Sequence, residues 1–252
     1  MPSVTSAASS RNLTSGGQKT AWRFEDAIWV LILPILLPLV VVFSLQIYAG
    51  LGLLPARWLE LMSADSRLAL VVQYFVSLMI YGAVIGWLMW RRRARWQDLG
   101  INTFQPRWLA VVGGLYIVQV VAMIAVFALV ELLLPQVNLD EKQSVLEFGL
   151  RGWGWWLSFV STVLIAPVLE EIMFRGIMFT ALTSRWRVWL AAIVSSLAFA
   201  FLHGQVNVGI YTFIFGLLLC WLYRKSRSIV PGIILHFLNN LVAFCLLSQA
   251  VT

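Results

Sequence analysis

Long apolar runs constrain this chain more than any other feature. Several stretches near 20 residues carry almost no charge, among them 27–49 and 229–249. A helix of that length crosses the ~30 Å hydrocarbon core of a bilayer. A spanning segment must satisfy its own backbone hydrogen bonds, which leaves helices or a closed barrel. The runs are continuous rather than alternating, and this excludes the barrel. The sequence therefore predicts an all-α fold, a polytopic transmembrane helix bundle of about seven helices.

The apolar runs also set the expected helix positions. Residues 1–23 are polar and rich in Ser, Thr and Gly, so we expect a disordered cytoplasmic tail. Pro167 predicts a kink or break within the fourth helix. The fifth and sixth helices are short, and the link at 204–208 is expected below the membrane surface. The predicted helices are 27–49, 67–90, 108–134, 153–183, 188–203, 209–223 and 229–249.

Composition agrees with a membrane protein. Hydrophobic residues make up 61% of the chain and charged residues only 12%, about half the share in soluble proteins. The net charge of +7 would suggest nucleic acid in a soluble protein, but here the basic residues sit in short loops between apolar runs. We therefore expect no nucleic-acid partner. Cys220 and Cys245 lie inside apolar runs and are interpreted as buried hydrophobes rather than a disulfide.

The basic residues also predict an orientation. With seven spans, 13 of the 18 Lys and Arg residues fall on one side, in the tail and in three loops. The other side carries four basic residues and five of the 11 acidic ones, such as Asp140 and Glu147. Because cytoplasmic loops are enriched in Lys and Arg, the N-terminus is expected in the cytoplasm and the C-terminus outside. We expect a multi-pass protein of the plasma membrane, with lipids as its surroundings.

One dense group of charges lies within the apolar runs: Glu170, Glu171 and Arg175. Charges inside a membrane helix cost about 2.5–3.5 kcal/mol each and are functional candidates. Glu171 and Arg175 are four residues apart, so they share a helix face and can pair. Glu170 points roughly 100° away from Glu171 and is predicted to look into the bundle. The alternative is that all three form a buried packing network. Glu131, near the end of its run, is interpreted as interfacial.

The chain has two histidines, His203 and His236, and both lie in apolar runs. Such a histidine often serves only as a hydrogen bond between helices, but two beside a buried carboxylate favour a site. His236 shares a helix face with Asn240, and Asn239 could substitute for Asn240 on spacing alone. Phe199 lies one turn before His203 and is expected to wall the same pocket.

Depth tests whether these groups can meet. At a rise of about 1.5 Å per residue, Glu170 lies roughly 20 Å from the cytoplasmic end of its helix and His203 about 21–22 Å. His236 and Asn240 lie about 12 and 18 Å from theirs. Three helices thus place polar groups near the middle of the membrane, which predicts one shared polar cavity.

At these residues the sequence resembles the CAAX prenyl protease and bacteriocin-processing (Abi) family of intramembrane proteases. The resemblance covers roughly residues 150–250, so we expect N-terminal transmembrane helices over 24–150 and a catalytic helix bundle over 151–252. Its motifs are EExxxR from Glu170 to Arg175, FxxxH from Phe199 to His203, and HxxxN from His236 to Asn240.

The resemblance implies roles for these residues. Glu170 and His203 would activate a water, and His236 with Asn240 would hold the oxyanion. Glu171 and Arg175 would be a structural pair. We expect no metal. The alternative is zinc or another divalent ion on Glu170, His203 and His236, although the sequence has no HExxH pattern.

The sequence thus predicts an intramembrane endopeptidase acting on a membrane-associated peptide or a lipidated protein. A first alternative is a non-catalytic bacteriocin-immunity or membrane partner protein of the same fold. A second is a transporter with Glu170 as its proton site. The presence of all four polar site residues favours the enzyme, and the absence of internal repeats counts against the transporter.

Overall fold

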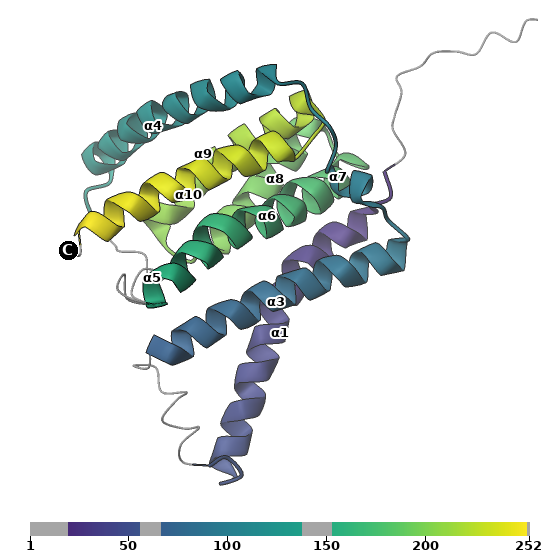
Figure 1. Ribbon diagram of the computed structural model, residues 1–252, viewed down its shortest axis with the longest axis vertical. Helices are drawn as coiled ribbons and strands as arrows, with labels where there is room; N and C mark the ends of the chain where they lie inside the picture. Colours follow the sequence, from purple (N-terminus) through teal and green to yellow (C-terminus); the bar gives the residue numbers. More distant parts are fainter. Residues whose placement is uncertain (1–19, 56–66, 138–152, 251–252) are drawn as a thin grey trace, which may run out of the picture.

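The computed structural model describes residues 20–55, 67–137 and 153–250, and within them it contains helices and no strand (Figure 1). Six helices are long and apolar enough to cross a membrane. This confirms the all-α, multi-pass class, and the helix ends lie within three residues of those predicted. The elements are α1 (Phe24–Gly50), α3 (Arg67–Arg92), η1 (Trp96–Leu99), α4 (Arg107–Leu133), α5 (Trp153–Ser158), η3 (Phe159–Ile165), α6 (Ala166–Glu171), η4 (Ile172–Phe179), α7 (Thr180–Thr183), α8 (Val188–Phe201), α9 (Val206–Ser226) and α10 (Val230–Ala250).

The prediction of seven full spans is wrong at α8. This helix has 14 residues and a length of about 21 Å, shorter than the ~30 Å core. It packs along α9, and the two are joined by a tight turn at 202–205 in which Gly204 has φ +72°. The depth of the link at 204–208 in the membrane stays a prediction.

The segment from α5 to α7 is one continuous helical rod, so the break expected at Pro167 does not occur. Two π-helical stretches, η3 and η4, flank α6 instead. Proline lacks an N–H, and its ring clashes with the carbonyl four residues earlier. The wider π turn of η3 just before Pro167 relieves that clash, because it moves the preceding carbonyls out of the α-helical position.

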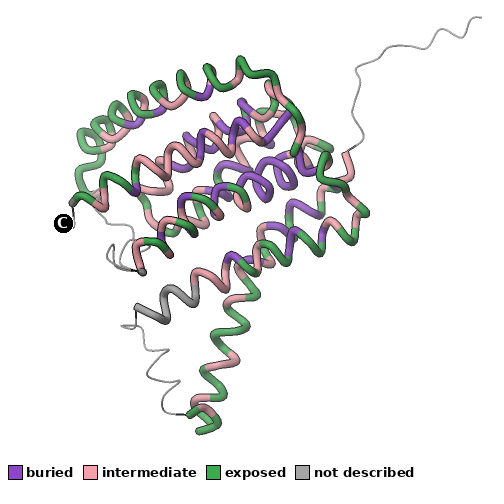
Figure 2. The backbone as a smooth tube through the Cα atoms, viewed as in Figure 1, coloured by how far each residue is buried: buried purple, intermediate pink, exposed green. Residues whose placement is uncertain are grey.

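The core lies around this rod. All eight residues of η4 are buried, and Figure 2 shows the burial concentrated on α6 and η4 and on the helix faces around them. Helices α1, α3 and α4 contribute residues to the same core as α8, α9 and α10. Gly176 marks the closest approach, since a Cβ there would lie 2.4 Å from the carbonyl oxygen of Leu99.

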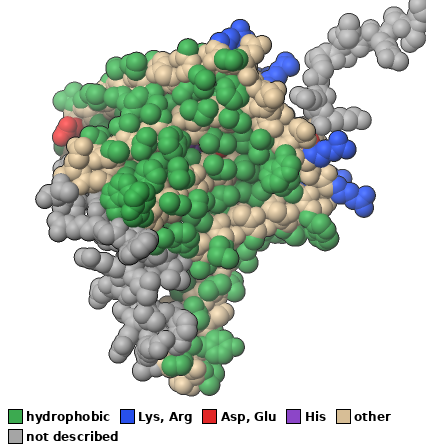
Figure 3. All heavy atoms as spheres, in the orientation of Figure 1, with side chains coloured by type: hydrophobic (Ala, Val, Ile, Leu, Met, Phe, Trp, Pro, Cys, Tyr) green, Lys and Arg blue, Asp and Glu red, His purple; other side chains and the backbone are tan. Residues whose placement is uncertain are grey.

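One end of the bundle gathers the charged loops. Arg92 donates to Glu25 and to the fully buried Asp26, which ties the end of α3 to the start of α1. Trp22 is buried and its Nε1 donates to the Asp98 carbonyl at 2.7 Å. Basic side chains cluster at this end in Figure 3. The predicted grouping of basic loops is thus present, whereas the acidic residues predicted opposite, such as Asp140, lie outside the described residues.

Trp22 corrects the expected tail. Residues 1–19 lie outside the described part of the chain, but Thr20 to Arg23 are placed against the bundle.

Much of the remaining surface is apolar, including Leu39, Val40 and Phe43 on α1 and Leu132 on α4. Such a surface is suited to lipid tails rather than to water.

Candidate active site

The paired glutamates of α6 occupy different environments. Glu171 is fully buried, and its Oε1 accepts from Arg175 Nη1 at 2.7 Å, as the four-residue spacing predicted. The side chain of Glu170 keeps 18% of its surface exposed. The π turn that begins after Glu171 lies between these partners, and its widening keeps Arg175 fully inside the bundle, over the ring of Phe199 at 4.6 Å. One carboxylate is therefore sealed in the fold and the other is accessible.

His236 lies between the two carboxylates. Its Nε2 is 3.6 Å from Glu170 Oε2 and its Nδ1 is 3.4 Å from Glu171 Oε1. Phe199 and Phe215 meet its ring edge-on, with centroids at 5.8 and 5.2 Å. The sequence indicated that His236 would approach Glu170, but not that it would contact both glutamates.

His203 stands at the end of α8 and is half-buried. Its Nδ1 lies 2.8 Å from the Phe199 carbonyl oxygen, which can only accept, so Nδ1 carries the hydrogen. In the neutral ring, Nε2 is then the acceptor. Phe199 packs edge-on against His203 at 4.8 Å and also contacts His236, so this one buried ring separates and holds both histidines. The described contacts thus join Glu170 directly to His236 and connect His203 to the group through Phe199.

Asn240 and Asn239 form one hydrogen-bonded pair on α10. Asn239 Nδ2 donates to Asn240 Oδ1 at 3.1 Å, and Asn240 Nδ2 donates to the Thr162 carbonyl at 2.9 Å. Asn240 therefore faces the rod that carries Glu170. Asn239 faces α4 and α9, where its Oδ1 accepts from Gln119 and Tyr211. Spacing alone left the choice between the two asparagines open, and the packing separates them.

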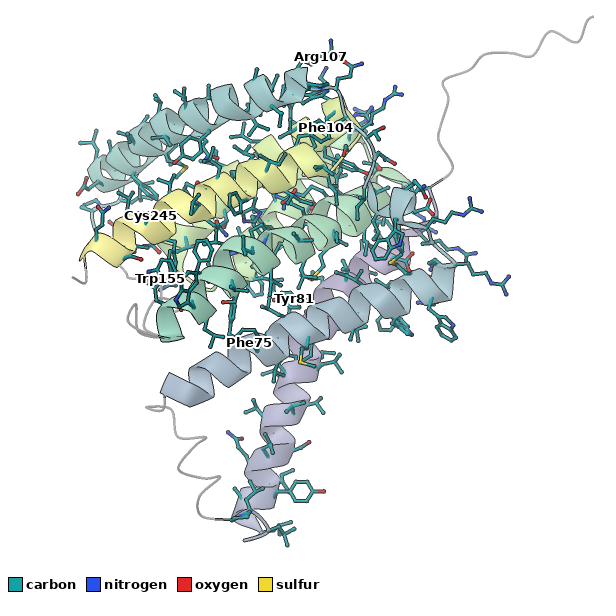
Figure 4. All side chains as sticks on the ribbon, viewed as in Figure 1. Phe75, Tyr81, Phe104, Arg107, Trp155 and Cys245 are labelled. Carbon is teal, nitrogen blue, oxygen red and sulfur yellow. The ribbon has the colours of Figure 1, made fainter. Side chains whose placement is uncertain are left out.

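Helix α3 closes the other side of Glu170. Tyr74 and Tyr81 both interact electrostatically with that carboxylate. Figure 4 shows Tyr81 between α3 and the rod of α6.

Sequence reasoning missed these tyrosines, and it also missed Gln119. The lone glutamine in the apolar α4 was a detectable signal, since polar side chains in membrane helices mark contacts between helices. Both tyrosines lie within α3, and nothing in their spacing pointed to Glu170.

Among the residues that the structure describes, no three His, Cys, Asp or Glu side chains are gathered as a metal ion requires. The alternative zinc set of Glu170, His203 and His236 is thus not assembled. Glu170 and His236 lie 3.6 Å apart, whereas the described contacts connect His203 to them only through the ring of Phe199.

Comparisons with known proteins point to one family. Residues 152–242 match the family described as type II CAAX prenyl endopeptidase, Rce1-like. A Bacillus subtilis (strain 168) protein named "Putative membrane peptidase YdiL" is 29% identical over 84 residues, which cover 33% of this chain and 34% of that protein. An Escherichia coli protein named "Uncharacterized 24.3 kDa protein" is 33% identical over 86 residues, 32% of this chain and 39% of that one.

The chain spans little more than a third of the length of these curated relatives, and no solved structure matches it. The matched residues 152–242 run from α5 into α10 and include both glutamates, both histidines and Asn240. This similarity confirms the resemblance read from the three motifs, and it lies in residues 152–242 of this multi-pass membrane protein.

Proposed function

We propose that this protein is an intramembrane endopeptidase that hydrolyses a peptide bond of a membrane-associated substrate. The observation that carries the proposal is the difference in environment between Glu170 and Glu171. Glu171 is neutralised by Arg175 and sealed, whereas Glu170 is partly accessible and faces His236. A packing network has no need for an accessible second carboxylate in a membrane, since each such charge is costly.

Glu170 is the proposed general base. A carboxylate that is within hydrogen-bond reach of a water can take its proton as the water attacks. His203 is the proposed second contact of the attacking water. Its Nδ1–H is committed to the Phe199 carbonyl, so its Nε2 is the nitrogen that can accept a hydrogen bond from that water.

His236 and Asn240 are the proposed oxyanion site. The ring of His236 presents Nε2 beside Glu170 and Nδ1 toward Glu171. A ring nitrogen that carries a hydrogen can donate it to an oxyanion that forms beside Glu170. Asn240 uses one amide N–H on the Thr162 carbonyl and has a second one to offer.

The reaction then balances without another reactant. Water gives a proton to Glu170 as its oxygen bonds to the carbonyl carbon of the substrate. His236 and Asn240 stabilise the negative oxygen of the tetrahedral intermediate. Glu170 returns the proton to the amide nitrogen as the C–N bond breaks, which yields a carboxylic acid and an amine. The acid then gives its proton to the amine, so the products leave as a carboxylate and an ammonium group. We propose that no metal takes part, because the donor side chains are not gathered around one point.

Similarity to the type II CAAX prenyl endopeptidases suggests the substrate class, a peptide with a lipidated cysteine near its C-terminus. The basic end of the bundle, where α1 begins, is the proposed cytoplasmic side of the plasma membrane. We propose that the site opens toward that side, since hydrolysis needs water that a bilayer interior does not supply.

The decisive experiment compares cells that produce the wild type with cells that produce Glu170→Gln. New peptide termini in the membrane fraction are quantified by mass spectrometry. We expect at least one terminus that depends on Glu170. Glu131→Gln, the same change at an exposed carboxylate on α4, is the matched control and should leave that terminus unchanged.

Two outcomes would contradict the proposal. If no terminus differs between wild type and Glu170→Gln while both proteins accumulate equally, the chain is not a protease. If Glu170→Gln still co-purifies with a protein that the wild type also retains uncleaved, a binding role such as immunity is favoured. A quenched-fluorescent peptide around the identified site, with and without a farnesyl group on its cysteine, then tests whether the lipid is recognised.

A further inference from the structure

Helix α4 carries one fully buried amide that the proposed mechanism does not use. Gln119 is 1% exposed, and only Val112 and Met123 are buried with it on that helix. A polar side chain in a membrane helix is retained where it bonds to another helix. Gln119 Nε2 donates to Asn239 Oδ1 on α10 at 3.1 Å, whereas its own Oε1 is buried with no hydrogen-bond donor. The side chain is therefore committed to this single contact.

The contact is the first link of a chain of hydrogen bonds that ends at the site. Tyr211 on α9 donates its hydroxyl to the same oxygen of Asn239. Asn239 Nδ2 donates to Asn240 Oδ1 at 3.1 Å, and Asn240 Nδ2 donates to the Thr162 carbonyl at 2.9 Å. Two donors on α4 and α9 are thus connected, through two asparagine amides, to the backbone of the rod that holds Glu170.

The Thr162 carbonyl determines which way the hydrogen bonds of this series run. The N–H of Ala166 bonds to the Ser161 carbonyl in the π turn. The next residue, Pro167, has no N–H, so the Thr162 carbonyl has no π-type helical donor and accepts from Asn240 instead. A carbonyl only accepts, so Asn240 must present its nitrogen there and its oxygen to Asn239. A flipped Asn240 would face acceptor with acceptor and donor with donor.

We infer that Gln119, Tyr211 and Asn239 are positioning residues that hold the Asn240 amide in the orientation which directs its free N–H toward the oxyanion. The inference rests on the proposed function, in which Asn240 is an oxyanion donor. Asn239 keeps its nitrogen toward Asn240 only if its oxygen, on the other side of the amide, has hydrogen-bond donors. Gln119 and Tyr211 supply the two donors that create this environment.

The inference separates catalysis from stability. Gln119→Met removes one hydrogen bond, but it also removes a buried oxygen that has no donor, so the midpoint of thermal unfolding should change little. The kcat of cleavage should fall by about three- to tenfold, as expected for the net loss of one hydrogen bond. KM should stay constant, because an oxyanion forms only in the transition state. Tyr211→Phe should act in the same way.

The experiment is a double-mutant cycle combined with NMR of the full chain in detergent micelles. Cleavage of the quenched-fluorescent peptide is measured for wild type, Gln119→Met, Asn240→Ala and the double variant. If Gln119 acts through Asn240, its substitution has no further effect once Asn240 is alanine. Ile117→Met and Tyr48→Phe are controls at exposed positions of α4 and α1 and should leave kcat unchanged.

The second readout does not depend on activity. With ¹⁵N-asparagine labelling, the side-chain amide signals of Asn240 are identified by their loss in Asn240→Ala. They should move in Gln119→Met and Tyr211→Phe but not in the controls. Unmoved signals overturn the inference, and moved signals with an unchanged kcat overturn the catalytic role of the relay. Moved signals in a protein that cleaves nothing support the relay while the proposed function fails.

Discussion

Loss of the buried cation at position 175 should destabilise the fold rather than merely inactivate the protein. Arg175 and Glu171 are both completely buried and 2.7 Å apart. Removing one member of a buried pair leaves an uncompensated charge, at a cost of about 3–5 kcal/mol. His236 Nδ1 lies 3.4 Å from the same carboxylate oxygen and supplies part of the compensation. We therefore expect Arg175→Met to lose about 3 kcal/mol, the lower end of that range.

For a chain of this size, such a loss corresponds to a decrease of about 6–12 °C in the unfolding midpoint. Thermal unfolding in detergent micelles measures it. The double variant Glu171→Gln with Arg175→Met should recover most of the stability, because no unpaired charge remains. Arg224→Met, at an exposed position on α9, is the control and should shift the midpoint by less than about 2 °C. An Arg175→Met protein that melts like the wild type yet has lost all cleavage would refute a structural role.

Further measurements test other parts of the structure. Asn240→Ala should reduce kcat by about 10²–10³ with KM nearly constant, and Glu170→Gln should leave less activity than that, as steady-state cleavage will reveal. Gly176→Ala should prevent stable folding, because the added carbon meets the Leu99 carbonyl at 2.4 Å, whereas Gly113→Ala, with open space around it, should melt like the wild type. A reporter fused to the C-terminus should be active outside the cytoplasm; activity inside would reject either the odd number of membrane crossings or the orientation. Chelators should not inhibit cleavage, and restoration of activity by zinc after dialysis would reject the metal-free mechanism.

Much of the architecture was predictable because the bilayer interior offers the backbone no hydrogen-bond partners. A run of about 20 apolar residues has one low-energy form in a bilayer, so the helices and their ends were expected within three residues. The exception was α8, where a short apolar run was predicted as a span although its 14 residues form only about 21 Å of helix. The contact between Glu171 and Arg175 was also predictable, since a four-residue spacing places both on one helix face whatever surrounds them.

The contacts between helices were not predictable in the same way. They depend on how each helix is rotated about its axis, and a helix such as α4 is apolar on nearly every side, so that only the lone Gln119 marks the face that turns inward. The position of His236 between two carboxylates and the approach of Tyr81 to Glu170 come from that rotation. The role of Pro167 has the same origin. A proline in the sequence indicates that one helical N–H is missing. Only the packing of α10 against the π turn brings Asn240 to the Thr162 carbonyl, which lacks a helical donor for that reason.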